Sequence, residues 1–235
     1  MDGALLVNKP RGMTSHDVVA VVRRALGIAR IGHTGTLDPM AEGLLVLLIG
    51  SATKHQQAFQ GHDKIYEATI KLGVKTATAD AEGAVIESSP VPALKRPQIM
   101  EALASFEGPL VQTPPAFSAV KVRGKPAYWW ARRQKPVVLS SRTVAIYALS
   151  LLAFEGDSLD VRVACSSGTY VRTLGEMIAQ RLGTVGHLTR LNRQSIGDWA
   201  LDAAVSFSFL KTASREDIFA QVKPLDSAPA CLPAS

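Results

Sequence analysis

Two hydrophobic periodicities occur along these 235 residues, and the order in which they occur limits the fold more than any other feature. Apolar and polar residues alternate at 64–72 and 159–165, as in strands that bury one face. Apolar residues recur at helical spacing after Thr14, and again at 97–106 and 172–182. Because strands and helices mix without a regular βαβ rhythm, we predict an α+β fold around a large mixed, mainly antiparallel sheet.

The first helix carries signals at both of its ends. Thr14 is followed three residues later by Asp17, which is the spacing of a capping box. Gly27 follows the apolar positions and suits the left-handed conformation at a helix C-terminus. The pattern therefore predicts a helix that begins after Thr14 and ends at Gly27.

The composition favours a globular protein with a polyanionic partner. Lys and Arg outnumber Asp and Glu by 26 to 20, a formal net charge of +6, although many small basic proteins bind no nucleic acid. No apolar run approaches the roughly 18 residues of a membrane span, and the N-terminus lacks the pattern of a signal peptide. Cys165 and Cys231 lie far apart and near no His pair, which argues against a zinc site or a disulfide framework. We therefore expect a cytoplasmic protein without a membrane span.

Basic residues gather in one part of the chain, where no acidic residue occurs between Glu107 and Glu155. The basic residues of this gap are Lys121, Arg123, Lys125, Arg132, Arg133, Lys135 and Arg142. Cationic groups can neutralise phosphates, and the interleaved aromatic side chains can stack on unpaired bases. The alternative is a solvated basic face, with Tyr128 or Trp129 turned into the core by a helix at 126–133.

A polar loop precedes an apolar strand in the segment RIGHTGTLDPMAEGLLVLLIG, residues 30–50. Its first two glycines and Pro39 keep the start irregular, while residues 44–50 suit a fully buried strand. Asp38 is therefore expected on a loop at the rim of the sheet, where a carboxylate can act as a nucleophile or a base. Asp-Pro is also a common turn, and Asp38 could simply cap it.

The segment GHTGTLDPMAEGLL closely resembles the catalytic motif of TruB-type pseudouridine synthases, in which the aspartate of the Leu-Asp-Pro triplet is essential. The resemblance continues in order through LLVNKPRGMTSHDVV, KIYEATIKLGVKTATADAEG, QTPPAFSAVKVRGKPAYWWAR, CSSGTYVRTLGEMI, GHLTRLNRQSIG and PLDSAPACLP. One departure is Asn8, which stands where an aspartate often precedes the Lys-Pro pair. The resemblance implies the pseudouridine synthase fold.

The resemblance also implies an isomerase that converts uridine 55 in the T-loop of tRNA to pseudouridine by base flipping, without a metal or other cofactor. Asp38 would either attack C1′ of the ribose or remove a proton from C2′, and both routes stay open. The expected partner is the T stem-loop of tRNA, and no obligatory protein partner is expected. The enzyme is expected to be a monomer. A non-catalytic protein that binds tRNA and helps it to fold is the alternative. A second alternative is a guide-RNA-dependent synthase of the same superfamily, for which protein partners would be expected.

Individual roles follow from the same resemblance. Arg172 matches the arginine that pairs with the catalytic aspartate, Asp38. Tyr170 matches the tyrosine that touches the base and is a candidate for the C5 proton transfer. Asp80 also lies in a family motif, and we interpret it as a turn-forming residue.

The remaining matches concern substrate contacts and support. His33 matches the histidine near the extruded base, Tyr66 the tyrosine that stacks on the flipped uracil, and Leu191 an apolar side chain against that base. Lys9 and Pro10 are expected to shape the loop under the site.

Two regions complete the expected organisation. A pseudouridine synthase catalytic domain is expected at 1–223, with an RNA-clasping insertion at about 112–140. The insertion resembles the family segment that clasps RNA, and its basic residues Lys121, Arg123, Lys125, Arg132 and Arg133 are expected on the RNA backbone. Residues 224–235 are expected to be a tail or linker, at the place where many members continue into a C-terminal RNA-binding domain.

Overall fold

The computed structural model describes residues 2–135 and 137–225, which form two compact units. Of these residues, the first unit contains 2–66 with 191–225, and the second contains 67–190. Strands β4 (Lys64–Leu72) and β12 (Gly186–Ile196) contribute residues to both units, because each unit boundary falls within one of them. The expected single catalytic domain at 1–223 stays a prediction, and most of the expected tail lies outside the described residues.

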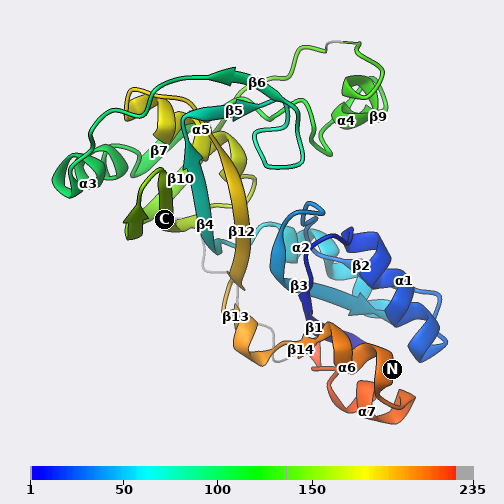
Figure 1. Cartoon of the computed structure of the whole chain (residues 1–235). Helices are drawn as coiled ribbons and strands as arrows, with labels where there is room; N and C mark the ends of the chain where they lie inside the picture. Colours follow the sequence, from blue (N-terminus) through cyan, green and yellow to red (C-terminus); the bar gives the residue numbers. More distant parts are fainter. Residues whose placement is uncertain (1, 136, 226–235) are drawn as a thin grey trace. The chain divides into compact units, whose positions relative to one another are not determined.

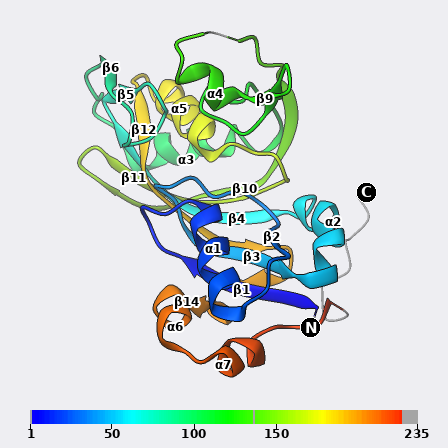
Figure 2. The same ribbon diagram turned by 90° about the vertical axis from the view of Figure 1, so that its right-hand side faces the viewer.

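The first unit is built on a mixed sheet in the order β14-β1-β3-β12. Its other elements are β1 (Gly3–Lys9), β2 (Ile31–His33), β3 (Glu42–Ile49), β13 (Trp199–Ala200), β14 (Val205–Ser206), α1 (Ser15–Leu26), α2 (Gln56–Gln60), α6 (Phe207–Thr212), α7 (Arg215–Ala220) and the 3₁₀ helices η1 (Gly50–His55) and η2 (Leu201–Ala203). Strand β1 runs antiparallel to β3, whereas β14 is parallel to β1 and β12 is parallel to β3. Helix α1 contacts α6 and α7, and the three helices lie together in both views (Figures 1 and 2).

The core of the first unit explains why residues 44–49 read as one continuous apolar run. Leu44, Val46 and Leu48 join a buried cluster on one face of β3, in which Phe59 stacks on Trp199 with ring centroids 4.9 Å apart. The residues between them, which face the other way, are completely buried as well. The predicted buried strand is therefore confirmed as β3.

The capping signals of the first helix are also confirmed. The Thr14 hydroxyl accepts a hydrogen bond from the Asp17 backbone N–H, and the Asp17 carboxylate accepts one from the Thr14 backbone N–H at 2.8 Å. Gly27 ends the helix at φ +65°, a left-handed conformation that favours glycine. This helix leads from β1 to β2, and the loop that carries Asp38 follows β2.

The second unit contains the other part of the sheet, in the order β12-β4-β11-β10-β7. Its further elements are β5 (Val74–Thr76), β6 (Val85–Ser88), β7 (Gly108–Gln112), β8 (Lys121–Val122), β9 (Lys125–Pro126), β10 (Arg142–Glu155), β11 (Ser158–Cys165), α3 (Arg96–Ala104), α4 (Ala127–Ala131) and α5 (Val171–Arg181). Strand β10 is antiparallel to both β11 and β7, so the expected mixed, mainly antiparallel sheet is confirmed. Burial alternates strictly along β4, as its sequence predicts.

The expected insertion forms a lobe of the second unit that carries β9 and α4 (Figures 1 and 2). Strands β8 and β9 form a short hairpin in which Lys121 pairs with Pro126. At its tip Arg123 and Gly124 both have positive φ, +50° and +77°, as a two-residue turn of the type I′ class requires. The turn therefore holds Arg123 at the exposed end of the hairpin.

Candidate active site

Asp38 lies on the loop between β2 and β3, half-buried, where the sequence predicts it. The loop is anchored to the start of α1, because the Ser15 hydroxyl donates to the Leu37 carbonyl at 3.2 Å and accepts from its N–H at 2.9 Å. Two further backbone bonds join Gly12 to the Pro39 carbonyl and Thr34 to the Val46 carbonyl. The carboxylate therefore stands on backbone that is fixed on both sides.

Arg193 is a second anchor of this loop, and sequence reasoning missed it. Its side chain on β12 is only 1% exposed. Nε donates to the Leu44 carbonyl at 2.7 Å, and Nη2 donates to the Gly35 carbonyl at 3.1 Å. A buried cation thus ties the glycine-containing loop to the strand that follows it. The sequence gives no signal that distinguishes it, because Arg190 on the same strand is exposed whereas Arg193 is buried.

Gly43 permits this close approach of β12 and β3. Its φ is +103°, and a Cβ atom at this position would lie 2.5 Å from the Arg193 carbonyl oxygen and 2.3 Å from Asn192 Oδ1. No side chain fits at such distances. The glycine after Glu42 is therefore required for the strand that follows Asp38.

His33 lies five residues before Asp38 and is held in its neutral form. The pKa of His33 is lowered to about 4, mainly by burial, and the positive charges of His16 and Arg193 contribute to this shift in the same direction. The His16 and His33 rings meet edge to face, with centroids 5.2 Å apart. Among the described residues Nδ1 of His33 has no hydrogen-bond partner. The neutral ring can take part in hydrogen bonds but carries no positive charge.

Lys9 is completely buried at the end of β1. Its ammonium donates to the carbonyls of Pro10 and Met13, at 2.9 and 2.6 Å. These bonds close the turn that leads into α1. The supporting role expected for Lys9 and Pro10 stays a prediction.

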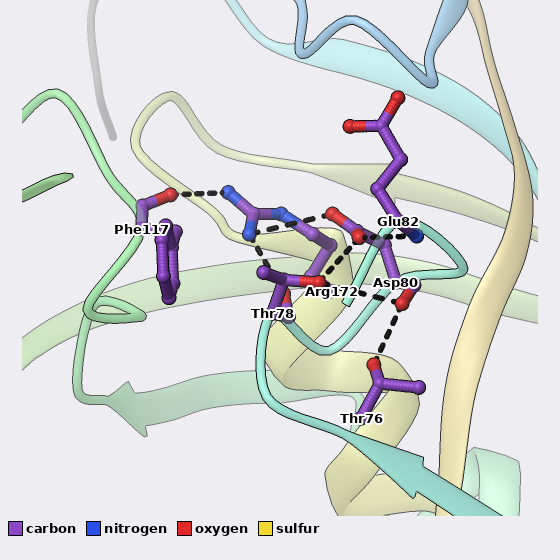
Figure 3. Close-up of polar contacts among 6 residues, drawn as sticks. All are labelled: Thr76, Thr78, Asp80, Glu82, Phe117 and Arg172. Carbon is purple, nitrogen blue, oxygen red and sulfur yellow. Dashed lines mark hydrogen bonds and ion pairs between the residues drawn. The ribbon is translucent and has the colours of Figure 1, made fainter. Parts of the chain in front are cut away.

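Arg172 is in the second unit, near the start of α5, and is 4% exposed. Its guanidinium donates to the carbonyls of Thr78 and Phe117, both at 2.8 Å, and forms an ion pair with Asp80 at 3.6 Å (Figure 3). The expected pairing of Arg172 with Asp38 joins residues of the two units and stays a prediction. What the structure adds is a set of acceptors that fix the guanidinium within the second unit.

Asp80 forms a turn, as its sequence context suggests, and is also a buried partner of Arg172. Its Oδ1 accepts hydrogen bonds from the Thr78 hydroxyl at 2.5 Å and the Glu82 N–H at 3.0 Å (Figure 3). Its carbonyl accepts from the Thr76 hydroxyl at 2.6 Å. The sequence interpretation missed the ion pair because Asp80 and Arg172 are distant in the chain.

The remaining predicted contacts with the base are distributed over the sheet. Tyr66 on β4 and Leu191 on β12 are both buried. Tyr170 precedes α5, and its backbone N–H donates to the Gln112 side chain at 3.1 Å. The roles of these three residues toward a flipped uracil stay predictions.

The five cations that we expect on the RNA backbone are all exposed: Lys121, Arg123, Lys125, Arg132 and Arg133. The Arg133 guanidinium lies 3.8 Å from the centroid of the Trp129 ring, and the Lys125 ammonium lies 6.0 Å from it. Trp129 and Trp130 are both half-buried, and Trp130 Nε1 donates to the Val122 carbonyl at 3.1 Å, while Tyr128 is 39% exposed. Helix α4 ends at Ala131, so the helix at 126–133 is shorter than expected.

Two further findings bear on function. Within residues 2–135 and 137–225, no group of three or more His, Cys, Asp or Glu side chains is arranged to hold a metal ion. None of the helices in the described part of the chain is long and apolar enough to cross a membrane.

This fold is that of the pseudouridine synthases. A solved complex of Cbf5 with Nop10 and Gar1 contains a chain that matches 95% of this one with a TM-score of 0.71 and 27% identity, over 60% of its own length. An archaeal box H/ACA sRNP Nop10–Cbf5 complex matches 95% of this chain with a TM-score of 0.68 and 25% identity, again over 60% of the solved chain. The present chain thus spans less than two thirds of these structures.

The chain belongs to the TruB family of pseudouridylate synthases, whose N-terminal domain matches residues 23–171. A tRNA pseudouridine synthase B of Aromatoleum aromaticum is 47% identical over 99% of this chain and 75% of its own length. A protein of the same name from Burkholderia pseudomallei is 44% identical over 97% of this chain and 75% of its own length. The family expected from the motifs is therefore confirmed.

Proposed function

We propose that this protein isomerises uridine 55 in the T-loop of tRNA to pseudouridine, with Asp38 as the reacting carboxylate. The chain is a tRNA pseudouridine synthase by its family and by relatives of that name at 44–47% identity. The observation that supports Asp38 is its loop, which hydrogen bonds hold at Gly35 through Arg193, at Leu37 through Ser15 and at Pro39 through Gly12. A fixed carboxylate needs no reorganisation when it meets the sugar.

The reaction breaks the bond between N1 of uracil and C1′ of ribose, rotates the base, and joins C5 to C1′. The hydrogen at C5 leaves and N1 gains one, so the atoms balance without a second substrate. The target base must first leave its stack, which costs a few kcal/mol that the pocket has to return. Asp38 either attacks C1′ or takes a proton from C2′, and Tyr170 is our candidate for the proton transfer at C5.

The other roles follow from where the side chains lie. Tyr66 and Leu191 are proposed as apolar contacts of the flipped base, and neutral His33 as a hydrogen-bonding contact near the T-loop. Arg172 is proposed to pair with Asp38 through a guanidinium that its other partners hold in place. Such a charge-assisted pair would keep the carboxylate ionised and oriented.

The cations of the insertion are proposed to bind RNA phosphates around this site. Their exposure and the absence of acidic residues between Glu107 and Glu155 support this role. We also propose that 1–223 acts as one catalytic domain, in the cytoplasm, as a monomer and without an obligatory protein partner. Size-exclusion chromatography with light scattering of the protein, alone and with tRNA, tests the oligomeric state.

An assay with unmodified tRNA transcript and no added cofactor tests the activity. Pseudouridine should appear at position 55 with the wild type and be absent with Asp38→Asn, which removes the charge but keeps the volume. Transcript binding should stay within a few-fold. Substantial turnover by Asp38→Asn would remove Asp38 from the reaction, and no product with the wild type would leave tRNA binding and folding as the function.

A further inference from the structure

Two strand ends of the second unit meet beside Tyr170. Arg142, the first residue of β10, is the cross-strand partner of Gln112, the last residue of β7. The two side chains therefore start from neighbouring positions at one end of the sheet. Both of them contact Tyr170, but they contact different parts of it.

Gln112 holds the backbone of Tyr170. Its Oε1 accepts from the Tyr170 N–H at 3.1 Å, and its Nε2 donates to the Tyr170 carbonyl at 3.4 Å. The amide is 1% exposed, so water does not compete for these two bonds. Gln112 thus sets the position from which the tyrosine ring extends.

Arg142 covers the ring of Tyr170. Its Cζ lies 4.7 Å from the ring centroid, within the range of a cation–π contact. Nη2 of the same guanidinium donates to the Gly168 carbonyl. A Cβ atom on Gly168 would lie 3.3 Å from the Arg142 Cζ, and Gly168 has φ +83°, so glycine suits this position on both grounds.

Among the described residues, the guanidinium of Arg142 is the cation that lies over the phenol ring of Tyr170. Within the described residues no hydrogen bond is found for its hydroxyl, so the polar contacts that can set the ring position are the guanidinium beside it and the Gln112 bonds to its backbone. The turn before it is also pinned, because Ser166 and Ala145 exchange two hydrogen bonds, at 2.8 and 2.9 Å.

We propose that Arg142 is a positioning residue for the isomerisation, which acts through the ring of Tyr170 and sets where the phenol meets the uracil. This inference rests on the proposed role of Tyr170. Nε of Arg142 is buried without a hydrogen-bond partner among the described residues, a cost that an arginine in open solvent avoids. A lysine could reach the Gly168 carbonyl but has no planar face to lie on the ring.

The kinetic test compares Arg142→Met, Arg142→Lys and the matched control Arg162→Met, in single-turnover and steady-state assays with tRNA transcript. Arg162 is an exposed arginine of the same unit, paired with Glu67 on the sheet, so its removal changes the charge equally. We expect Arg142→Met to lower kcat on the order of tenfold, since small misplacements of a reacting group have such effects. KM should stay within about two- to threefold, because the effect falls on the reacting geometry and not on uniform binding.

The kcat of Arg142→Lys should lie between that of the wild type and that of Arg142→Met. A normal kcat in Arg142→Met, or an equal loss in Arg162→Met, overturns the proposal.

A double-mutant cycle separates positioning from a merely structural effect. In a Tyr170→Leu background the ring is gone, so Arg142→Met should cause no further loss in the rate of the single turnover. A further loss equal to that in the wild-type background would show that Arg142 acts elsewhere.

A spectroscopic readout does not depend on activity. The chain has four tyrosines, so 3-fluorotyrosine labelling gives ¹⁹F signals that Tyr170→Phe assigns. Arg142→Met should shift the Tyr170 signal and leave the other three in place, while Arg162→Met should shift none of these four beyond local effects. An unmoved Tyr170 signal overturns the proposal. If the wild type makes no pseudouridine, the proposed function fails, and the ¹⁹F result still decides the positioning.

Discussion

Asp80 and Arg172 form a buried ion pair, with Oδ2 and Nη1 3.6 Å apart and both side chains at most 5% exposed. The distance is too long for a good hydrogen bond, so the attraction between the two is mainly Coulombic. The hydrogen bonds of Asp80 go instead to Thr78 and Glu82, and those of Arg172 go to the carbonyls of Thr78 and Phe117 (Figure 3). The pair thus connects the turn at 76–82 with the start of α5.

Removal of the Asp80 carboxylate should destabilise the protein strongly. Asp80→Ala leaves the Arg172 charge buried and two donors without their acceptor, which typically costs about 3–5 kcal/mol of unfolding free energy. Asp80→Asn keeps an oxygen for those donors and should cost less, about 1–3 kcal/mol. Urea unfolding at pH 7 measures both, with Asp157→Asn at an exposed ion pair as a control that should change little. Wild-type stability of Asp80→Asn would contradict a role for the charge, whereas equal losses in the two variants would contradict a role for the hydrogen bonds from Thr78 and Glu82.

Arg172→Lys should lower activity while the protein stays folded. One ammonium cannot reach the carbonyls of Thr78 and Phe117 and the Asp80 carboxylate with the fork geometry of a guanidinium. We expect kcat to fall on the order of tenfold or more, since the cation proposed to orient Asp38 is displaced. Single-turnover rates on tRNA measure this, and Arg181→Lys at the other end of α5 is the matched control. A near-normal rate would mean that the fork is not needed.

The cations of the insertion should make the affinity for tRNA depend steeply on salt concentration. Each phosphate that a cation neutralises contributes a slope of roughly −0.7 to −0.9 to a plot of log K against log salt. Arg132→Ala with Arg133→Ala should therefore flatten the slope by about 1.5 units if both arginines engage phosphate. KM for tRNA should rise much more than kcat falls.

The comparison variant for the salt series is Arg162→Ala with Arg181→Ala, which removes the same charge outside the insertion. A solvated basic face predicts the same slope for the wild type and the Arg132/Arg133 variant. That outcome would take these two arginines out of the RNA-binding site.

The depressed pKa of His33 makes stability depend on pH. The folded pKa of about 4 lies below the ordinary value of 6.5, so the unfolded chain binds the proton more readily between these values. The stabilising effect of the neutral, buried ring is fully present above pH 6.5 and is lost as pH falls toward 4. From the size of the shift, at most about 3 kcal/mol is involved.

Urea unfolding of the wild type and His33→Gln at several pH values between 4 and 7 measures this effect. The variant should lose less stability over this range than the wild type. His16→Gln should raise the pKa of His33 slightly, because it removes a nearby charge but leaves the burial, which is the main cause. Parallel pH profiles for the wild type and His33→Gln would contradict the assignment.

The sequence by itself determined the features that depend on local patterns. The capping box at Thr14 and the glycine end at Gly27 act within one helix, and the alternation of β4 depends only on neighbouring residues. The loop position of Asp38 also followed from local signals, because glycines and proline interrupt regular structure in front of an apolar strand. The family resemblance supplied candidate roles that no periodicity contains.

The tertiary structure alone decided which distant side chains meet. Arg193 holds the carbonyl of Gly35 across 158 positions of the chain, and Arg172 meets the carbonyl of Thr78 across 94. Arg142 belongs by sequence to a basic stretch, yet its guanidinium lies on the Tyr170 ring. A charged residue in a sequence shows no sign of whether it will be buried, because burial of its charge depends on acceptors that only the folded chain brings together.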